Sequence, residues 1–198
     1  MSQWPEPVEL NGTHITVVPT SLDQKSDLEE AAADGELHKL WYTTVPTPEG
    51  VGAEIERRLS LQKKGSMLPF TIIDKSANKA VGMTTYMNID APNRRLEIGS
   101  TWYRKSAQRS PINTECKLLL LRHAFEVLDC IAVEFRTHFI NQQSRNAIER
   151  LGAKFDGILR AHMIMPNGTV RDTAVYSIIA SEWPTVEANL KWRLEMPR

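Results

Sequence analysis

The chain has 198 residues, of which 41% are hydrophobic, so it is long enough to bury one sizeable core and suits a single domain. Lys plus Arg and Asp plus Glu both total 24, and this zero formal charge gives no net attraction for nucleic acid or an anionic membrane. No apolar stretch approaches the roughly 20 residues of a membrane span, and no signal-peptide pattern begins the sequence, so we expect a cytoplasmic protein.

The N-terminal quarter predicts one strand followed by helices. Residues 13–19 alternate as a strand does, whereas residues 21–41 carry apolar positions at helical spacing that Gly35 interrupts. A threonine followed by a proline opens a further helix over residues 47–62, and Gly65 ends it.

Three strand candidates come next, over residues 70–74, 80–88 and 95–103. Polar turns separate them, which is typical of an antiparallel meander. The nearly all-apolar segment 116–125 has helical length, and residues 131–139 alternate again as a strand. Because a helix connects these last two strands, we expect them to run parallel to each other.

The C-terminal part predicts a short helix over residues 144–151, ended by Gly152, and a hairpin. Its strands cover residues 155–165 and 169–179 around a Pro-Asn-Gly turn. An amphipathic helix over residues 181–194 completes the chain.

These elements predict one α/β domain over residues 1–198, with a core over about 13–180 and a C-terminal helical extension over 181–198. We expect a mixed, mostly antiparallel sheet of about seven strands, flanked by helices. The aromatic residues of the terminal helix, Trp183 and Trp192, leave two alternatives open: a homodimer interface, or packing back onto the chain's own sheet.

The cysteines and histidines predict neither a disulfide nor a metal site. Cys116 lies on the apolar helix and Cys130 at the beginning of a strand, so we expect two buried free thiols. The five histidines share no spacing typical of zinc ligands, and no metal is expected.

The most informative segment is the polar turn over residues 108–115, which joins a strand to the apolar helix. Ser110 is a good capping residue, and Pro111 suits the first helical position because its missing N–H would have no intrahelical partner. Arg109 adds a positive charge. Three N–H groups are then expected at the positive end of the helix dipole, where phosphate binds: those of Ile112, Asn113 and Thr114. The alternative is a capped helix that binds nothing.

A second polar junction follows the next strand, where Asn141 and Ser144 open a helix. In open α/β sheets ligands bind at the carboxyl ends of strands, so two junctions after adjacent parallel strands are expected to share one cleft. Helix capping alone is the alternative interpretation of Asn141 and Ser144.

In this order the motifs resemble the GCN5-related N-acetyltransferase superfamily, and within it the ribosomal-protein alanine acetyltransferases. The resemblance runs nearly end to end, and six segments carry it: Glu97-Ile98-Gly99, the Gln108 to Glu115 turn, His123-Ala124-Phe125, Asn141 with Ser144, Leu151-Gly152-Ala153 and Gly157-Ile158-Leu159-Arg160.

The family's pyrophosphate loop begins with Gln or Arg and ends in Gly-x-Gly or Gly-x-Ala. Alignment places Gln108 first, Pro111 at the inner glycine and Asn113 at the final small residue. Pro111 departs from the family pattern, because it gives up an N–H donor that glycine would offer. The side chain of Arg109 is the candidate that compensates.

The resemblance implies a sheet splayed between the fourth and fifth strands, with acetyl-CoA in the splay as co-substrate. Splayed strands leave unpaired peptide groups that an extended amide chain can satisfy. The implied role of Asn141 is to steady the pantetheine arm, and that of Ser144 to protonate the leaving thiolate. The full set of implied cofactor-binding residues is Trp102, Tyr103, Gln108, Arg109, Ser110, Ile112, Asn113, Thr114, Asn141 and Ser144.

For the base that takes the proton of the amine, the resemblance favours Glu97, acting through water. A solvated surface carboxylate is the alternative for Glu97, since neighbouring strand residues point to opposite faces. His138 competes, because an imidazole accepts a proton near neutral pH, although a strand histidine is often a packing residue. Tyr86 and Tyr103 rank below these groups and below Ser144.

The acceptor is implied to contact residues 37–46 and 158–173, which show no strong acidic or basic trough. Trp41, Tyr42 and two methionines, Met163 and Met165, indicate an apolar rim, with core packing as the slightly favoured alternative. This rim suits a small amine, an amino acid or a peptide N-terminus better than a nucleic acid. Two other classes of function stay open: a non-catalytic acyl-CoA-binding module, and a nucleotide-binding regulator.

Overall fold

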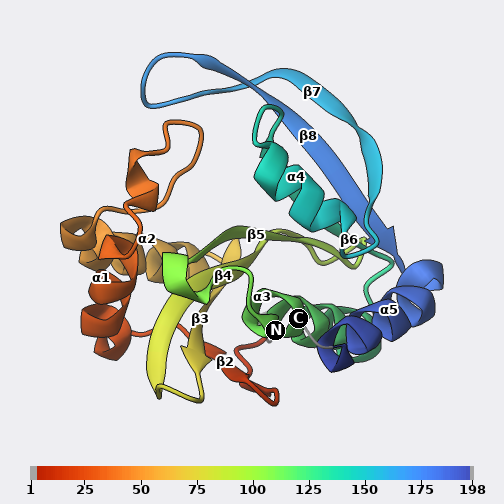
Figure 1. The fold of residues 1–198 in the computed structure, drawn as a ribbon. Helices are drawn as coiled ribbons and strands as arrows, with labels where there is room; N and C mark the ends of the chain where they lie inside the picture. The colour runs from red at the N-terminus through yellow and green to blue at the C-terminus, as the bar shows by residue number, and fades with distance from the viewer. Residues whose placement is uncertain (1–3, 197–198) are drawn as a thin grey trace.

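The computed structural model describes residues 4–196. Figure 1 shows one twisted sheet with helices packed around it. The strands are β1 (Leu10–Asn11), β2 (Ile15–Pro19), β3 (Met67–Asp74), β4 (Lys79–Asp90), β5 (Arg95–Tyr103), β6 (Ala132–His138), β7 (Lys154–Ile164) and β8 (Val170–Ile179). The α-helices are α1 (Lys25–Ala33), α2 (Val51–Lys63), α3 (Pro111–Arg122), α4 (Gln142–Glu149) and α5 (Trp183–Glu195).

All eight strands form one sheet in the order β1-β2-β3-β4-β5-β6-β8-β7. Only the β5–β6 pair is parallel among these strands, which confirms the expected mixed, mostly antiparallel α/β sheet. The prediction of about seven strands missed β1, because a strand of two residues is too short to show alternation.

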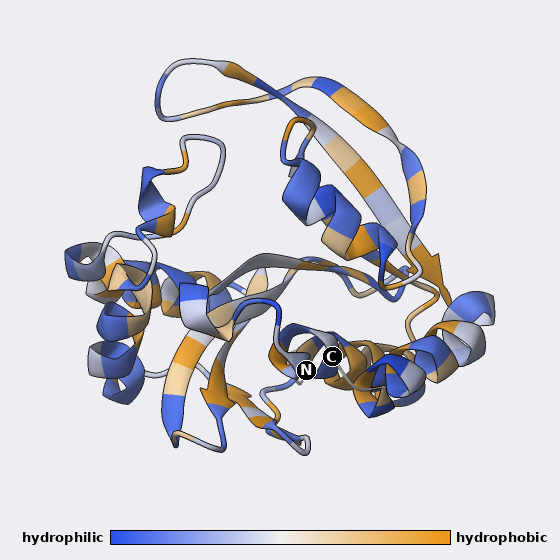
Figure 2. Ribbon diagram, viewed as in Figure 1, coloured by the Kyte–Doolittle hydropathy of each residue, from blue (hydrophilic) through white to orange (hydrophobic). Residues whose placement is uncertain are grey.

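Helices cover both faces of the sheet and enclose two apolar clusters. On one face, α1 and α2 pack over β4 and the end of β5, where Met83 and Trp102 are buried with Leu28 and Ile55. On the opposite face, α3 and α5 enclose the larger cluster, and Figure 2 shows the apolar character of α3. Most residues of α3 are buried, its four leucines among them, because the helix lies between the sheet and α5.

The structure of the terminal helix distinguishes the two alternatives for Trp183 but not for Trp192. Trp183 and Leu190 are buried in the larger cluster, and Trp183 donates from Nε1 to Glu126, 2.9 Å away. Trp192 is 56% exposed. Trp183 therefore packs back onto its own chain. For the exposed Trp192, a homodimer interface stays a prediction.

A buried carboxylate fixes the beginning of α3 against the N-terminal strand. The Glu115 side chain accepts hydrogen bonds from three consecutive backbone N–H groups, those of Thr13, His14 and Ile15, at 2.7, 2.8 and 2.9 Å. Gly12 leaves room for it, because a Cβ there would lie 2.5 Å from the Glu115 carboxyl carbon. The polar turn before α3 therefore has a fixed place relative to β2.

The parallel strands β5 and β6 pair only at their beginnings. Three pairs join them, of which the last is Glu97 with Glu134, and the strands separate beyond this point. An extra residue in β5 increases the separation: Ser100 has a φ of 47° in the left-handed region, and the register with β4 shifts there. The carbonyl of Ser100 accepts a hydrogen bond from the buried Arg58, 3.1 Å away. The resulting splay agrees with the one that the family resemblance implies.

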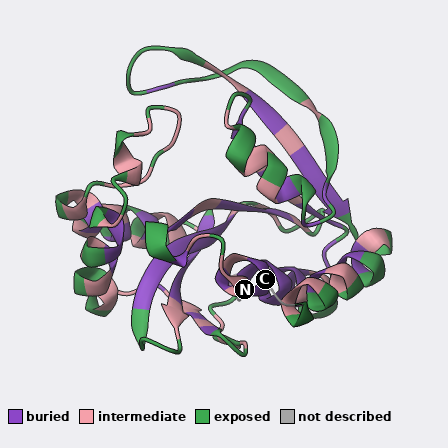
Figure 3. Cartoon of the chain, viewed as in Figure 1, coloured by how far each residue is buried: buried purple, intermediate pink, exposed green. Residues whose placement is uncertain are grey.

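The last two strands form the expected hairpin, with β8 between β6 and the edge strand β7. Gly168, with a φ of 81°, closes the turn by donating to the Met165 carbonyl at 2.8 Å. Figure 1 shows the hairpin arching beyond α4, and Figure 3 shows β7 exposed along most of its length. The turn end of the hairpin therefore extends past α4 toward the side of the sheet where β5 and β6 separate.

Both cysteines are buried and free, as predicted. Within residues 4–196, no helix has the length and apolar character needed to cross a membrane. The same part of the chain contains no group of three His, Cys, Asp or Glu side chains arranged to hold a metal ion.

Candidate active site

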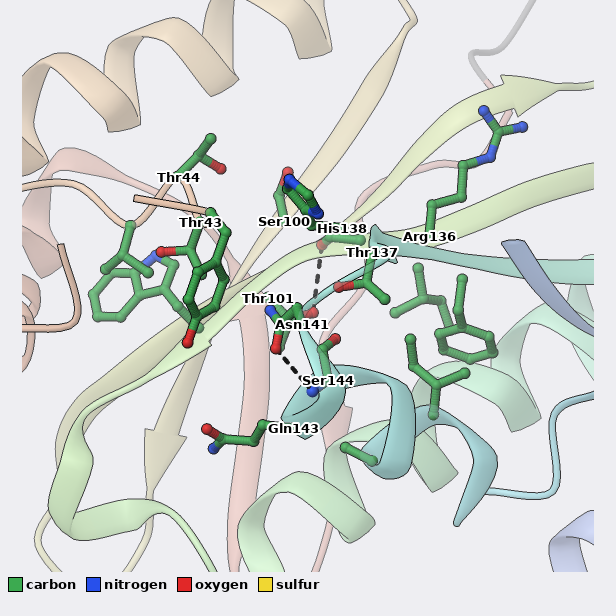
Figure 4. Close-up of a pocket in the computed structure, with 18 of the residues that line it drawn as sticks. Thr43, Thr44, Ser100, Thr101, Arg136, Thr137, His138, Asn141, Gln143 and Ser144 are labelled. Carbon is green, nitrogen blue, oxygen red and sulfur yellow. Dashed lines mark hydrogen bonds between the residues drawn. The ribbon is translucent and has the colours of Figure 1, made fainter. Parts of the chain in front are cut away.

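A cavity of about 660 Å³ occupies the splay between β5 and β6. The second half of β5 and the end of β6 line it, together with the turn before α3, the beginning of α4, the loop 37–45 and the β7–β8 hairpin. Figure 4 shows Asn141, Gln143 and Ser144 at the beginning of α4, facing the cavity, with Thr43 and Thr44 supplied by the loop. Segments far apart in sequence therefore meet where the sheet opens.

The turn before α3 has the capped geometry that the sequence predicted. Ser110 is the N-cap, and its hydroxyl accepts from the N–H of Ile112 at 3.3 Å, while Pro111 is the first helical residue. Arg109 adopts a φ of 59°, which is uncommon and strained for a residue other than glycine. Gln108, Arg109, Ser110 and Asn113 all line the cavity.

Two amides of the expected anion site are directed elsewhere. Ile112 and Thr114 are buried and do not line the cavity. The N–H of Ile112 is taken by Ser110, and helical geometry from Pro111 onward pairs the N–H of Thr114 with the carbonyl of Ser110. The sequence argument missed this because it treated capping and ligand binding as compatible uses of one N–H. By the same geometry, the N–H of Asn113 comes before the first i→i−4 bond of the helix and has no intrahelical partner of that kind.

The second junction also combines capping with a position at the cavity. Asn141, and not Ser144, is the N-cap of α4, and its side-chain oxygen accepts from the N–H of Ser144 at 3.0 Å. The Ser144 hydroxyl lines the cavity and has no hydrogen-bond partner among residues 4–196. Gln143 of α4 donates to Gln108 across 3.5 Å, so the two helix beginnings touch.

The end of β5 presents backbone and aromatic groups to the same cavity. Trp102 and Tyr103 line it, although both side chains are largely buried. Burial raises the pKa of the Tyr103 phenol well above its ordinary value, so this hydroxyl is neutral and is no base. Tyr86 does not line the cavity: it is fully buried and donates to the Leu120 carbonyl at 2.6 Å. It is therefore a structural residue.

Glu97 is a buried carboxylate, and the alternative of a solvated surface residue is wrong. It is 4% exposed and lines the cavity at the last paired position of β5. Asn88 donates to it at 2.6 Å, and the Arg136 guanidinium lies 3.5 Å away. Burial raises the pKa of Glu97, and the Asn88 hydrogen bond and the Arg136 charge only partly oppose this rise. A raised pKa brings a carboxylate closer to the range suited to a base.

His138 also lines the cavity, at the end of β6. Its Nδ1 accepts from the N–H of Ile140 at 3.3 Å, and Trp41 lies edge-on to the ring. Burial, aided by the positive charge of Arg171, lowers the pKa of His138, so the ring is neutral at pH 7. Its buried Nε2 has no hydrogen-bond partner within residues 4–196.

Lys117 is a cavity residue that the sequence argument did not single out. Its ammonium is buried on α3 and donates to the hydroxyls of Thr101 and Thr84, at 2.9 and 3.3 Å. Burial lowers its pKa to about 8. The available signal was a lone lysine followed by four leucines inside a helix that is otherwise buried.

The segments expected to meet the acceptor contribute fewer apolar groups and more charge than predicted. Tyr42 and Met163 line the cavity, whereas Trp41 is half-exposed beside it and Met165 is buried elsewhere. Arg171 of β8 also lines the cavity. Its charge was overlooked because a single arginine in a strand gives no sequence pattern.

Comparison with known proteins identifies the fold and the kind of domain. Residues 14–154 match the family model described as "Acetyltransferase (GNAT) domain". A GCN5-related N-acetyltransferase from Brucella melitensis is 32% identical, with a TM-score of 0.87 over 96% of this chain and 86% of that one. Mycobacterium smegmatis RimJ, solved in complex with CoA-disulfide, is 20% identical, with a TM-score of 0.78 over 96% of both chains. At that identity the RimJ likeness shows the fold alone.

One curated relative matches over part of its length. "Putative ribosomal N-acetyltransferase YdaF" of Bacillus subtilis is 33% identical over 102 residues. The match spans 52% of this chain and 55% of the relative, a little over half of each.

Proposed function

Because the chain belongs to the GNAT acetyltransferase family, we propose that it transfers the acetyl group of acetyl-CoA directly to a primary amine. One observation carries the proposal: a single cavity joins both helix beginnings to a buried carboxylate through the opening between β5 and β6. When bound, acetyl-CoA would supply an activated thioester. The chain's own groups bind it, hold the amine and move the protons.

The residues around the splay fit a coenzyme with two phosphates and an amide-bearing arm. Beyond Glu97, the peptide groups of β5 have no partners on β6, so those near Trp102 and Tyr103 suit the pantetheine amides. The phosphates suit the turn before α3, where the amide of Asn113 and the exposed side chain of Arg109 face the cavity. Gln108 and Ser110 complete this turn.

The acyl transfer needs one group that accepts a proton from the amine and one that donates a proton to the thiolate. We assign the first role to Glu97, through water, with His138 as the alternative. The unpaired Ser144 hydroxyl is the proposed donor, and Asn141 holds it in place by capping α4. In this scheme the new C–N bond forms as the C–S bond breaks, and no covalent enzyme intermediate is required.

For the acceptor we propose the N-terminal amine of a peptide or protein. The support is the Bacillus relative, which is named as a ribosomal N-acetyltransferase. The mouth of the cavity agrees with an extended chain, because it is bounded by a loop from one side and a long hairpin from the other.

The test is to mix purified protein with acetyl-CoA and a panel of peptides and small amines, and to measure free thiol and acetylated product. We expect thiol release that depends on the amine, with one acetyl group per thiol. Tight acetyl-CoA binding without turnover on any amine would favour the non-catalytic acyl-CoA-binding module. That alternative rests on Pro111, whose position in the phosphate turn offers no N–H. Equal thermal stabilisation by ATP, NAD and coenzyme A would instead favour a nucleotide-binding regulator.

A further inference from the structure

One face of the sheet beside the cavity carries a chain of ion pairs. Arg95 lies 2.5 Å from Glu134, Glu134 lies 2.8 Å from Arg136, and Arg136 lies 3.5 Å from Glu97. These side chains share a face because their positions alternate along β5 and β6 and are paired in register. Figure 4 shows Arg136 extending away from α4, toward this face. Arg95 and Arg136 in this series of ion pairs therefore each have a carboxylate beside them.

Arg171 of β8 lies on the same face but has no such partner. Its Nε donates to the buried Thr173 hydroxyl at 2.9 Å, and Thr173 is paired with His138 in the sheet. No ion pair links Arg171 to a carboxylate within residues 4–196. The guanidinium is partly buried, and the negative charge of Glu97 acts on it without a direct ion pair. Burying a charge that has no hydrogen-bonded carboxylate beside it is costly. Its two terminal nitrogens are left for a ligand, held in a fixed direction by the Nε bond.

The other cations around the cavity are accounted for. The charged side chains that line it, histidines aside, are Arg58, Glu97, Arg109, Lys117, Arg136, Arg150 and Arg171. Arg58 is paired with Glu54 at 2.7 Å, and Lys117 is held by two threonine hydroxyls. Arg109 and Arg150 come from the α3 and α4 side, where the coenzyme phosphates are proposed. Arg171 is the remaining cation, and Glu97 is the one carboxylate in this described lining.

We propose that Arg171 binds a carboxylate of the acceptor, so that the preferred acceptor is a primary amine with an acid group close to it. This inference rests on the proposed acetyl transfer. The amine is directed toward Glu97 and the acid toward Arg171, which matches two opposite charges on one wall of the cavity. A guanidinium binds a carboxylate through two parallel hydrogen bonds, which adds direction as well as affinity.

The carboxylate has two possible sources, and matched acceptors distinguish them. Alanine against alaninamide tests the α-carboxylate of a free amino acid. The peptide amides Glu-Ala-Ala and Gln-Ala-Ala test an acidic side chain on an N-terminal residue. For the true source we expect the acidic member to have a kcat/KM roughly 10- to 100-fold higher than its neutral twin.

The variant Arg171→Gln should abolish this preference: the acidic acceptor should lose roughly 10- to 100-fold in kcat/KM, clearly more than the neutral acceptor loses. Arg160→Gln is the matched control, since Arg160 is an exposed arginine of the same hairpin, paired with Asp172, that does not line the cavity. The charge reversal Arg171→Glu should instead favour a Lys-Ala-Ala amide over its glutamate counterpart. This gain cannot arise from misfolding.

Equal use of acidic and neutral acceptors by the unaltered protein would overturn the inference, as would an equal loss on both in Arg171→Gln. Calorimetry of the same acceptors, with coenzyme A present, separates this failure from that of the proposed function. Acid-dependent binding that needs Arg171, without turnover on any amine, would support the carboxylate-binding role of Arg171 and refute the acetyl transfer. If neither binding nor turnover is observed, both the inference and the proposed acetyl transfer are refuted.

Discussion

The two sides of the cavity present different kinds of chemical group to a ligand. On the coenzyme side, the beginnings of α3 and α4 offer capped helix ends, neutral amides and the exposed Arg109. On the acceptor side, the sheet offers buried or half-buried ionised groups, Glu97 and Arg171 among them, whose neighbours come from other strands. The first side recognises its ligand mainly through backbone that many sequences can supply. The second depends on individual side chains, so changes there should have larger effects on chemistry and smaller effects on coenzyme binding.

The largest effect is expected from Glu97→Gln on the acceptor side. The amide keeps the size of the carboxylate but cannot accept the proton of the amine, so kcat should fall roughly 100- to 10,000-fold. Because burial raises the pKa of Glu97, the activity of the unaltered protein should rise with pH through this raised value, and the variant should lose that rise. Steady-state thiol release from pH 5 to 9 measures both.

The control is the dissociation constant for coenzyme A, which should not change in Glu97→Gln. Retention of most activity with an unchanged pH profile would transfer the base role to His138. It would also weaken the division between the two sides.

Ser144→Ala should have the next largest effect, and it tests the coenzyme side. Removing the hydroxyl takes away the proposed proton donor to the thiolate, so we expect kcat to fall roughly 10- to 100-fold. The cap of α4 survives, because Asn141 accepts from the backbone N–H of Ser144 and not from its side chain. Coenzyme affinity and melting temperature should therefore stay close to those of the unaltered protein, and a large drop in either would show a structural role instead.

Lys117→Met probes the helix between the two sides, through stability. The pKa of Lys117 is lowered to about 8, so below that pH the folded protein holds a buried ammonium that the unfolded chain holds in water. The variant removes this penalty and two hydrogen bonds, which leaves a net gain of about 1–2 kcal/mol in the free energy of unfolding at pH 7.

The gain should shrink as the pH rises from about 8 toward the ordinary value of 10.5, because the folded lysine is then already neutral. Urea unfolding at several pH values tests this, with the half-exposed Lys191 changed to Met as the control. A gain that does not vary with pH would show that the Lys117 ammonium is not strained by burial.

Pro111→Gly should have the smallest effect. It restores an N–H at the first helical position and should tighten coenzyme A binding roughly two- to tenfold. Stability should fall by about 1 kcal/mol, because glycine is more flexible in the unfolded chain. Pro184→Gly, which changes a proline in the first turn of α5, is the matched control: it should cost similar stability without altering affinity. Weaker binding in Pro111→Gly would mean that the phosphate turn needs the rigidity of proline.

The sequence predicted the coenzyme side of the cavity better than the acceptor side. Alternation placed β5 at Arg95–Tyr103 as the structure has it, and residue types placed Ser110 as the cap of α3. Local rules succeed there because caps and alternation depend on neighbours in sequence. The sequence left Asn141 and Ser144 both as capping candidates of α4, since both are good capping residues three positions apart, and in the structure Asn141 is the cap.

The acceptor side was less predictable because its chemistry comes from distant segments. Glu97 is contacted by Asn88 and Arg136, which come from other strands, and the position of Arg171 beside this group appears only once β8 lies next to β6. Lys117 gave a local signal, a charge in an apolar helix, but its threonine partners lie on β4 and β5. Such pairings are properties of the fold and have no short-range pattern.

The hydrogen bonds between Glu115 and the backbone of residues 13–15 have a consequence for folding and for ligand binding. They join residues up to 102 positions apart, so the turn before α3 reaches its final place only after a long loop has closed. A ligand that binds this turn in the folded state must then stabilise β2 as well, although it never touches that strand. The backbone N–H groups of Thr13, His14 and Ile15 would exchange with solvent more slowly whenever the coenzyme is bound, and they would report occupancy from the far side of the helix.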